Sequence, residues 1–285
     1  MPSSSLATES KPQRGIFNDT SYFLLSLVSV ANGLSYNVML WQNGELASPF
    51  SPVIIIALFT IGYLHVKTSN HTSVTPQEKE NIIVPCCVLI LTSLIPSAFS
   101  AWIGLFAAAI WRYSFTKKLK MQFILWALIA TSFLWKICLF KISSASILSA
   151  ETWVIGTAIL PFFPEIYTVG NHLHITESHV LSIGIGCSCF SNLSFVLLGW
   201  VALFYLKGGV SVSWKWPTMI AIFLMITNII RIGLMAMSYD MYVEVHEGIG
   251  VPIYDAILAL IVVSALLFKP PKESVSTAHP HQNCD

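Results

Sequence analysis

Three residue types that together can perform acyl transfer occur in the second half of the chain, close to long apolar runs. Cys187 begins one apolar run, Arg231 lies inside the next, and His246 lies in the short polar break before the last. A thiol can attack a carbonyl carbon, a histidine can carry protons near neutral pH, and an arginine can stabilise a developing oxyanion. The sequence therefore predicts a complete set of groups for acyl transfer, if the fold brings the three side chains together.

Arg231 interrupts a run that otherwise has the character of a membrane span. An arginine near the centre of a bilayer costs about 2.5 to 3.5 kcal/mol on insertion scales, so such a residue usually faces a polar cavity or a partner. Asn228 lies three residues earlier and therefore on the same helical face. This polar pair favours an organised site. The alternative is a structural charge that pairs with an outer acid such as Asp255 or Glu244.

Cys187 follows two glycines in the stretch GIGCSCFSN, at the expected start of a helix. The unpaired N–H groups and the dipole at a helix N-terminus favour an anion, which makes a thiol there a better nucleophile. The alternative is a small residue of the core. Cys189 competes for the same role, but it lies about 200° further around a helix and should point elsewhere. A redox pair of the two is a weaker interpretation, because redox motifs normally space cysteines by two residues.

His246 opens the stretch HEGIG, which we expect to form a loop. Gly248 and Gly250 allow the backbone to turn tightly and to bring the imidazole over the ends of the neighbouring helices. A lone histidine in a loop is more often a surface residue, and the expected nearness of Cys187 and Arg231 is what favours a functional role.

A second group of histidines lies upstream in the stretch NHLHITESH. His172 and His174 would share a face of an extended segment, and Glu177 follows them, so the three could bind a metal. The more economical interpretation is that they are solvated polar residues. We therefore predict neither a metal site nor a cofactor.

The composition identifies the surroundings of these residues as a membrane. The chain has 285 residues, of which 55% are hydrophobic and 10% charged, and its mean hydropathy is +0.70. A soluble domain usually carries about 25% charged residues. The net charge of +1 gives no indication of nucleic-acid binding. We therefore expect an all-α polytopic membrane protein in contact with the lipid bilayer.

About eight transmembrane helices are expected, since a span needs about 20 apolar residues. They are predicted near 21–41, 50–66, 82–98, 99–114, 121–140, 186–206, 217–238 and 251–268. The first is interpreted as a retained span, because no small-residue cleavage site follows it. A single membrane domain over 21–268 would lie between a polar cytoplasmic N-terminus, 1–20, and a disordered cytoplasmic tail, 269–285.

Segment 142–164 decides the predicted orientation. If it does not cross the membrane, nearly all lysines and arginines of the short loops fall on one side, as the positive-inside rule requires. Both termini are then cytoplasmic, and a long outer segment runs from about Lys141 to Ile185, with 142–164 interfacial or re-entrant. The basic residues on the inner side are Lys11, Arg14, Lys67, Lys79, Arg112, Lys117, Lys118, Lys120, Lys207, Lys215, Lys269 and Lys272, and the exceptions are Lys136 and Lys141.

With this topology the candidate residues resemble, in order and context, the signature of the exosortase/archaeosortase family. That signature is Cys-Ser-Gly at the start of a span, Asn-x-x-Arg within the next span, and His-x-x-x-Gly in the following outer loop. The matching residues are Cys187-Ser188, Asn228-Ile-Ile-Arg231 and His246-Glu-Gly-Ile-Gly250. The resemblance covers roughly residues 160 to 268, and the first half of the chain matches only as generic spans. The departure is Cys189, where the family pattern has glycine.

The resemblance implies a cysteine protease and transpeptidase of the plasma (inner) membrane whose active site faces the extracytoplasmic side. Its partners would be exported proteins with a C-terminal transmembrane sorting signal of Pro-Glu-Pro type, and an envelope acceptor. The expected catalytic residues are Cys187, Arg231 and His246, supported by Asn228 and Ser188. The alternatives are a transporter, in which Arg231 and Asn228 line a path, and a noncatalytic envelope-assembly factor. A transporter should show internal repeats and broken helices, which the sequence lacks.

Overall fold

The computed structural model describes residues 18–42, 52–69, 81–116, 120–177, 179–209 and 212–267, and most of these are helical. The polar N-terminus and the tail of the predicted domain scheme lie almost entirely outside the described residues. The α-helices are α1 (Asp19–Gln42), α2 (Pro52–Ser69), α4 (Ile83–Leu94), α5 (Ala98–Phe115), α6 (Lys120–Leu134), α7 (Phe140–Ile159), α8 (Cys189–Leu206), α9 (Lys215–Met237), α10 (Tyr239–His246) and α11 (Gly250–Ser264).

Four helical segments among the described residues are long and apolar enough to cross a bilayer. They are Lys120–Ile159, Cys189–Leu206, Lys215–Met237 and Gly250–Leu267, while Pro52–Thr68 and Ile83–Leu94 are apolar but shorter. The surface of α9 exposes Ile222, Phe223, Ile226 and Ile230, which suits contact with lipid. The chain is thus a mostly helical protein with the features of an all-α membrane protein.

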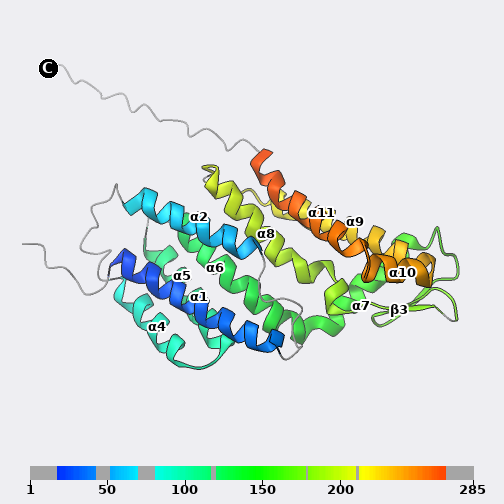
Figure 1. Ribbon diagram of the computed structural model, residues 1–285, viewed down its shortest axis with the longest axis horizontal. Helices are drawn as coiled ribbons and strands as arrows, with labels where there is room; N and C mark the ends of the chain where they lie inside the picture. Colours follow the sequence, from blue (N-terminus) through cyan, green and yellow to red (C-terminus); the bar gives the residue numbers. More distant parts are fainter. Residues whose placement is uncertain are drawn as a thin grey trace, which may run out of the picture.

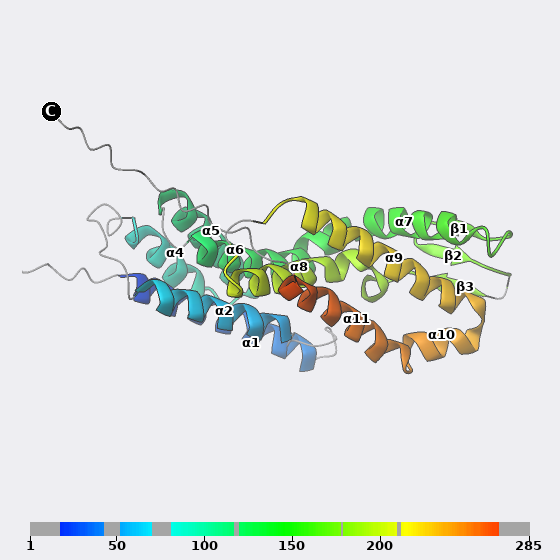
Figure 2. The same cartoon turned by 90° about the horizontal axis from the view of Figure 1, so that it is seen from above.

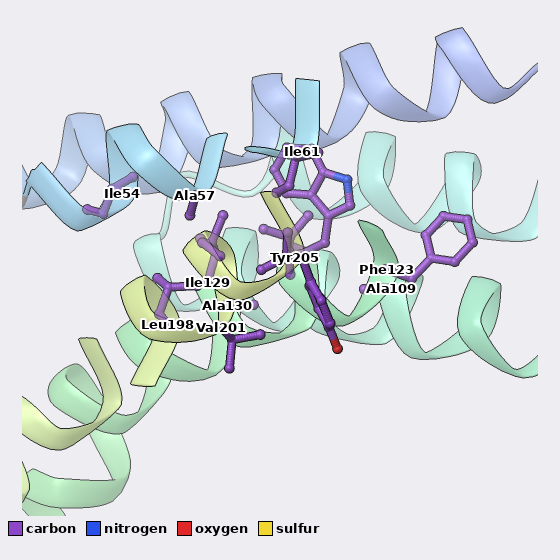
Figure 3. Close-up of a cluster of buried hydrophobic side chains, with 14 of the residues drawn as sticks. Ile54, Ala57, Ile61, Ala109, Phe123, Ile129, Ala130, Leu198, Val201 and Tyr205 are labelled. Carbon is purple, nitrogen blue, oxygen red and sulfur yellow. The ribbon is translucent and has the colours of Figure 1, made fainter. Parts of the chain in front are cut away.

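The larger core holds the bundle together around α2, α6 and α8 (Figure 3). Ile61 of α2, Ile129 of α6 and Leu198 of α8 are completely buried there. Each expected span coincides with a helix, although α4 has only 12 residues and so extends for about 18 Å. Figure 1 shows that successive helices of the bundle run alternately toward and away from the end at which α7 and α10 lie.

The fifth expected span and segment 142–164 form one continuous helix, so the expectation of a re-entrant segment is wrong. Lys120–Ile159 comprises 40 residues, with α6 and α7 joined by the π-helix η1 (Trp135–Leu139). Forty residues extend for about 60 Å, roughly twice the apolar thickness of a bilayer. No proline occurs between Lys120 and Ile159, and α7 ends at Ile159, two residues before Pro161. The exposed face of α7 includes Lys141, Ser143 and Ser146, which suits a helix that projects beyond the lipid.

A small antiparallel sheet follows α7 and was not predicted. Its strands are β1 (Tyr167–Val169), β2 (His172–His174) and β3 (Val180–Ser182), in the order β1-β2-β3. The β1–β2 hairpin turns at Gly170, whose φ of 59° favours glycine. Figures 1 and 2 show the sheet and α10 at the same end of the molecule, past the bundle.

A second hydrophobic core lies beneath this sheet and joins it to α7, α9 and α10. Four of its residues are at most 1% exposed: Ile155 of α7, Leu173 of β2, Ile232 of α9, and Ile183, which follows β3. Cys187 belongs to the same cluster. The end of the molecule that carries Cys187 is therefore packed as a unit, distinct from the bundle core.

Candidate active site

Cys187 lies in the turn that joins β3 to α8. It is the last residue of the short 3-10 helix η2 (Ile185–Cys187), and α8 begins two residues later at Cys189. The prediction that Cys187 starts the helix is therefore displaced by two residues, because Ser188 in extended conformation is the N-cap. Cys187 is 9% exposed, so it is sheltered, and it lines the cavity described below.

His246 is the last residue of α10, and the expectation that it lies in a loop is wrong. The two glycines after it do make the tight turn that was expected. A Cβ on Gly248 would lie 2.8 Å from the Glu244 carbonyl oxygen, and one on Gly250 would lie 2.4 Å from the Val245 Cα. This close approach of backbone to backbone fixes the end of α10 against the start of α11.

The structure brings Cys187 and His246 together from segments 59 residues apart. The Sγ atom of Cys187 lies 3.9 Å from Nδ1 of His246, within reach of a sulfur hydrogen bond. The imidazole is stacked on the Tyr242 ring, with 5.1 Å between centroids and 19° between planes. The stacking orients the imidazole so that one nitrogen faces the thiol.

A cavity of about 260 Å³ opens at this pair. One wall is the end of the sheet, from Leu181 to Gly184, and the other is α10 with Tyr242 and His246. Gly186, Cys187 and Met235 complete the lining. A chain segment placed in the cavity would therefore meet the thiol and the imidazole at the same time.

Arg231 does not line this cavity. Its guanidinium carbon lies 4.6 Å from the centre of the Tyr254 ring of α11, in a cation–π contact. Its Nε is buried and has no hydrogen-bond partner among the described residues. Along α9, Arg231 lies between Asn228, which contacts Cys187, and Met235, which lines the cavity. The structure thus places Arg231 at the level of the site, with its guanidinium turned toward α11.

The interpretation of Arg231 as half of an ion pair gains no support. Among the residues that the structure describes, the one ion pair joins Arg112 to Asp19 at 2.6 Å, in the bundle. Neither Asp255 nor Glu244 pairs with Arg231.

A buried carboxyl group, Glu151 of α7, lies directly behind the Cys187 turn. Its Oε2 accepts a hydrogen bond from the Ser188 hydroxyl at 2.5 Å, and its Oε1 accepts from the Cys189 backbone N–H at 2.8 Å and from Asn228 Nδ2 at 2.9 Å. Asn228 Nδ2 also donates to the Cys187 carbonyl oxygen at 2.9 Å. Glu151 is 1% exposed, and Ser188 and Asn228 are fully buried. One carboxyl group therefore ties α7, the start of α8 and α9 together beneath the thiol.

Glu151 was missed in the sequence, although a signal for it exists. It is the only acidic residue of segment 142–164, which is otherwise apolar or weakly polar. A buried acid requires hydrogen-bond partners, so an isolated glutamate in such a segment predicts a polar network. The predicted supporting residues, Asn228 and Ser188, are two of its three partners.

The backbone donors around the thiol are already in use. The N–H of Cys187 donates to the Gly184 carbonyl, that of Ser188 to the Ile185 carbonyl, and that of Cys189 to Glu151. A developing oxyanion at Cys187 would need a donor from elsewhere. Arg231, whose Nε is unpaired, is a suitable source.

Cys189 and the upstream histidines lie outside this arrangement. The Cys189 thiol is buried against the Met225 sulfur at 3.9 Å. His172 is exposed, and His174 stacks on Tyr167 with 4.6 Å between ring centroids. Within the described residues, no group of three His, Cys, Asp or Glu side chains could hold a metal ion.

Comparisons with known proteins identify no relative. No protein-family model, curated protein or solved structure matches the chain. The functional argument therefore depends on the geometry of the site.

Proposed function

We propose that the protein is a membrane-embedded cysteine endopeptidase and transpeptidase of exosortase type. It would cleave exported proteins near a C-terminal transmembrane sorting signal and transfer the new carboxyl end to an envelope acceptor. The observation that carries this proposal is the 3.9 Å approach of the Cys187 thiol to His246 Nδ1 at an open cavity. A thiol with a proton acceptor in reach is the minimal apparatus of a cysteine protease.

The proposed reaction begins with attack of Cys187 Sγ on a substrate carbonyl carbon, while the thiol proton passes to His246 Nδ1. Collapse of the tetrahedral intermediate breaks the C–N bond, and the imidazolium gives its proton to the leaving amine. The acceptor nucleophile attacks the resulting thioester and gives its proton to His246. Collapse of the second tetrahedral intermediate breaks the C–S bond, and the imidazolium returns a proton to the Cys187 sulfur. The chemistry needs no cofactor.

In this mechanism Arg231 stabilises the oxyanion, and its position sets a condition on that role. The guanidinium must leave the Tyr254 ring and turn toward the cavity, since it does not line the cavity in this structure. Negative charge that develops on the substrate oxygen favours this movement, because it offers the unpaired Nε an acceptor.

The proposed topology has eight spans, with both termini in the cytoplasm and the site outside. In Figure 1 the first helix, α1, runs toward the end that carries α7 and α10, and the last, α11, runs away from it, which supports an even number of crossings. In Figure 1 the end of α2, the end of α5 and the start of α6 lie away from the site, and these helix ends carry Lys67, Arg112 and Lys120. Positive charge at that end agrees with a cytoplasmic position. The proposed membrane is the plasma (inner) membrane.

Processing of a reporter protein in cells tests the proposal. The reporter carries a C-terminal signal made of a Pro-Glu-Pro motif, a transmembrane helix and a basic cluster, and its size reports cleavage. Cys187→Ala and His246→Ala should each abolish processing. Cys138→Ala, which removes a free cysteine in η1 away from the cavity, is the matched control. If Cys187→Ala processes the reporter normally, at equal amounts of inserted protein, the protease proposal is wrong. A transporter or an assembly factor would then be the better interpretation.

A further inference from the structure

The cavity at Cys187 is bounded on one side by an unpaired strand edge. In the order β1-β2-β3, strand β3 has β2 on one side and no strand on the other. Figure 2 shows α10 on the side of β3 that faces away from β2, and residues of both elements line the cavity. The free edge of β3 therefore faces into the cavity.

The hydrogen-bond pattern identifies which backbone groups point toward this edge. The Ile183 N–H donates to the Asn171 carbonyl, and the Ile175 N–H donates to the His179 carbonyl. In the same antiparallel register Leu181 faces Leu173, so residues 179, 181 and 183 direct their backbone groups to β2. The alternate residues, Val180 and Ser182, direct theirs away from it. No described residue hydrogen-bonds to these outward groups.

The free edge leads directly to the thiol. Gly184 continues β3 in extended conformation, with φ of −91° and ψ of 176°, and Cys187 follows after one short turn. A Cβ on Gly184 or on Gly186 would meet nothing within 4 Å, so both glycines leave open space beside the edge. Glycine in or beside a strand marks a place where another backbone can approach closely.

We propose that the substrate binds as an added strand on the free edge of β3, between β3 and α10, so that its scissile carbonyl comes to Cys187. This inference rests on the proposed protease function and names how its substrate is recognised. Unpaired N–H and C=O groups that alternate along a strand are satisfied best by the backbone of another extended polypeptide. Recognition through backbone groups tolerates variation in the substrate side chains beside the cleavage point. The cavity and the open space beside the two glycines provide the room.

The edge can be tested by removing its donor and leaving the sheet intact. In Ser182→Pro the lost N–H is the one that points into the cavity, and proline is tolerated at such an edge position. We expect kcat/KM for reporter processing to fall roughly five- to tenfold, the effect of one lost backbone hydrogen bond with some steric hindrance. The matched control is Thr168→Pro in β1, whose N–H also points away from β2 but on the opposite edge of the sheet. The control should process normally.

A second variant and a folding measurement make the test decisive. Gly184→Val fills the space beside the edge, and its backbone conformation suits any residue. Gly62→Val, at another position where a Cβ meets nothing, is its control. The rate at which iodoacetamide alkylates Cys187 reports whether the site is folded. The added-strand proposal is overturned if the wild type cleaves the reporter through Cys187 and both variants, shown to be folded by a normal alkylation rate, cleave it as fast as the wild type. If Cys187→Ala also cleaves, the protease function itself fails, which is a separate result.

Discussion

Replacement of Glu151 by leucine should destabilise the end of the molecule that carries the site. Leucine has a similar size but accepts no hydrogen bond, so the Ser188 hydroxyl and the Cys189 N–H lose their partner. Asn228 keeps its second bond, to the Cys187 carbonyl. A buried donor without a partner costs about 1 to 3 kcal/mol, so the two groups together should lower the free energy of unfolding by roughly 2 to 6 kcal/mol.

Glu151→Gln separates the hydrogen bonds from the carboxyl group. The glutamine Oε1 can accept from Cys189 and Asn228, and its Nε2 can donate to the Ser188 hydroxyl oxygen. All three contacts are then kept, and we expect a loss of only about 1 kcal/mol. Glu165→Leu, which removes an exposed acid after α7, should have almost no effect on the free energy of unfolding.

Denaturant unfolding of the purified protein in detergent measures these differences, and the alkylation rate of Cys187 reports local opening. The expected order of stability is wild type, then Glu151→Gln, then Glu151→Leu, with faster alkylation in Glu151→Leu. Equal stability and equal alkylation rates in all three proteins would refute the role assigned to the network. A loss as large in Glu165→Leu would show that the effect is not specific to the buried carboxyl.

Further substitutions test the arginine, the second cysteine, the glycine turn and the topology. Arg231→Lys should abolish reporter processing, because lysine keeps the charge but lacks the planar fork of the guanidinium; normal processing would exclude the fork as the requirement. Cys189→Ala should retain most processing, since its thiol contacts Met225 and not the cavity, and an inactive variant would show that the nucleophile was misassigned. Gly250→Ala should lower the melting temperature much more than Gly62→Ala, because its Cβ would lie 2.4 Å from the Val245 Cα, and equal melting temperatures would contradict the close approach. In a cysteine-free background, Glu177→Cys should be labelled by an impermeant thiol reagent from outside the cell and Lys67→Cys should not; the reverse pattern would invert the proposed orientation.

The helices that coincide with expected spans were predictable because each has a run of apolar residues long enough to be recognised without its neighbours. Helix α10 was not predicted, because its eight residues carry no such run. The continuation of α6 into α7 was not predicted. The serines of 143–149 resemble an interfacial segment, but they do not interrupt the helix. Strands of three residues carry too little alternation to be recognised, which explains why β1, β2 and β3 were missed.

The candidate site was predictable in part. The order of Cys187, Arg231 and His246 on alternating spans was sufficient to expect a common position, and the structure brings Cys187 and His246 together. The direction of the Arg231 side chain was not predictable, because it depends on the Tyr254 ring of another helix. The role of Glu151 depends on three partners from two other segments. The sequence indicates that a buried acid must have partners, but it does not identify them.

The most direct test of a cysteine nucleophile at position 187 is to trap the thioester. Purified protein in detergent is mixed with the reporter that carries the sorting signal, quenched in acid and analysed by mass spectrometry. Our account predicts that the N-terminal fragment of the reporter is attached to Cys187, that hydroxylamine releases it, and that Cys187→Ala forms no adduct. Cleavage of the reporter with no adduct on Cys187, at a rate that Cys187→Ala matches, would contradict the account.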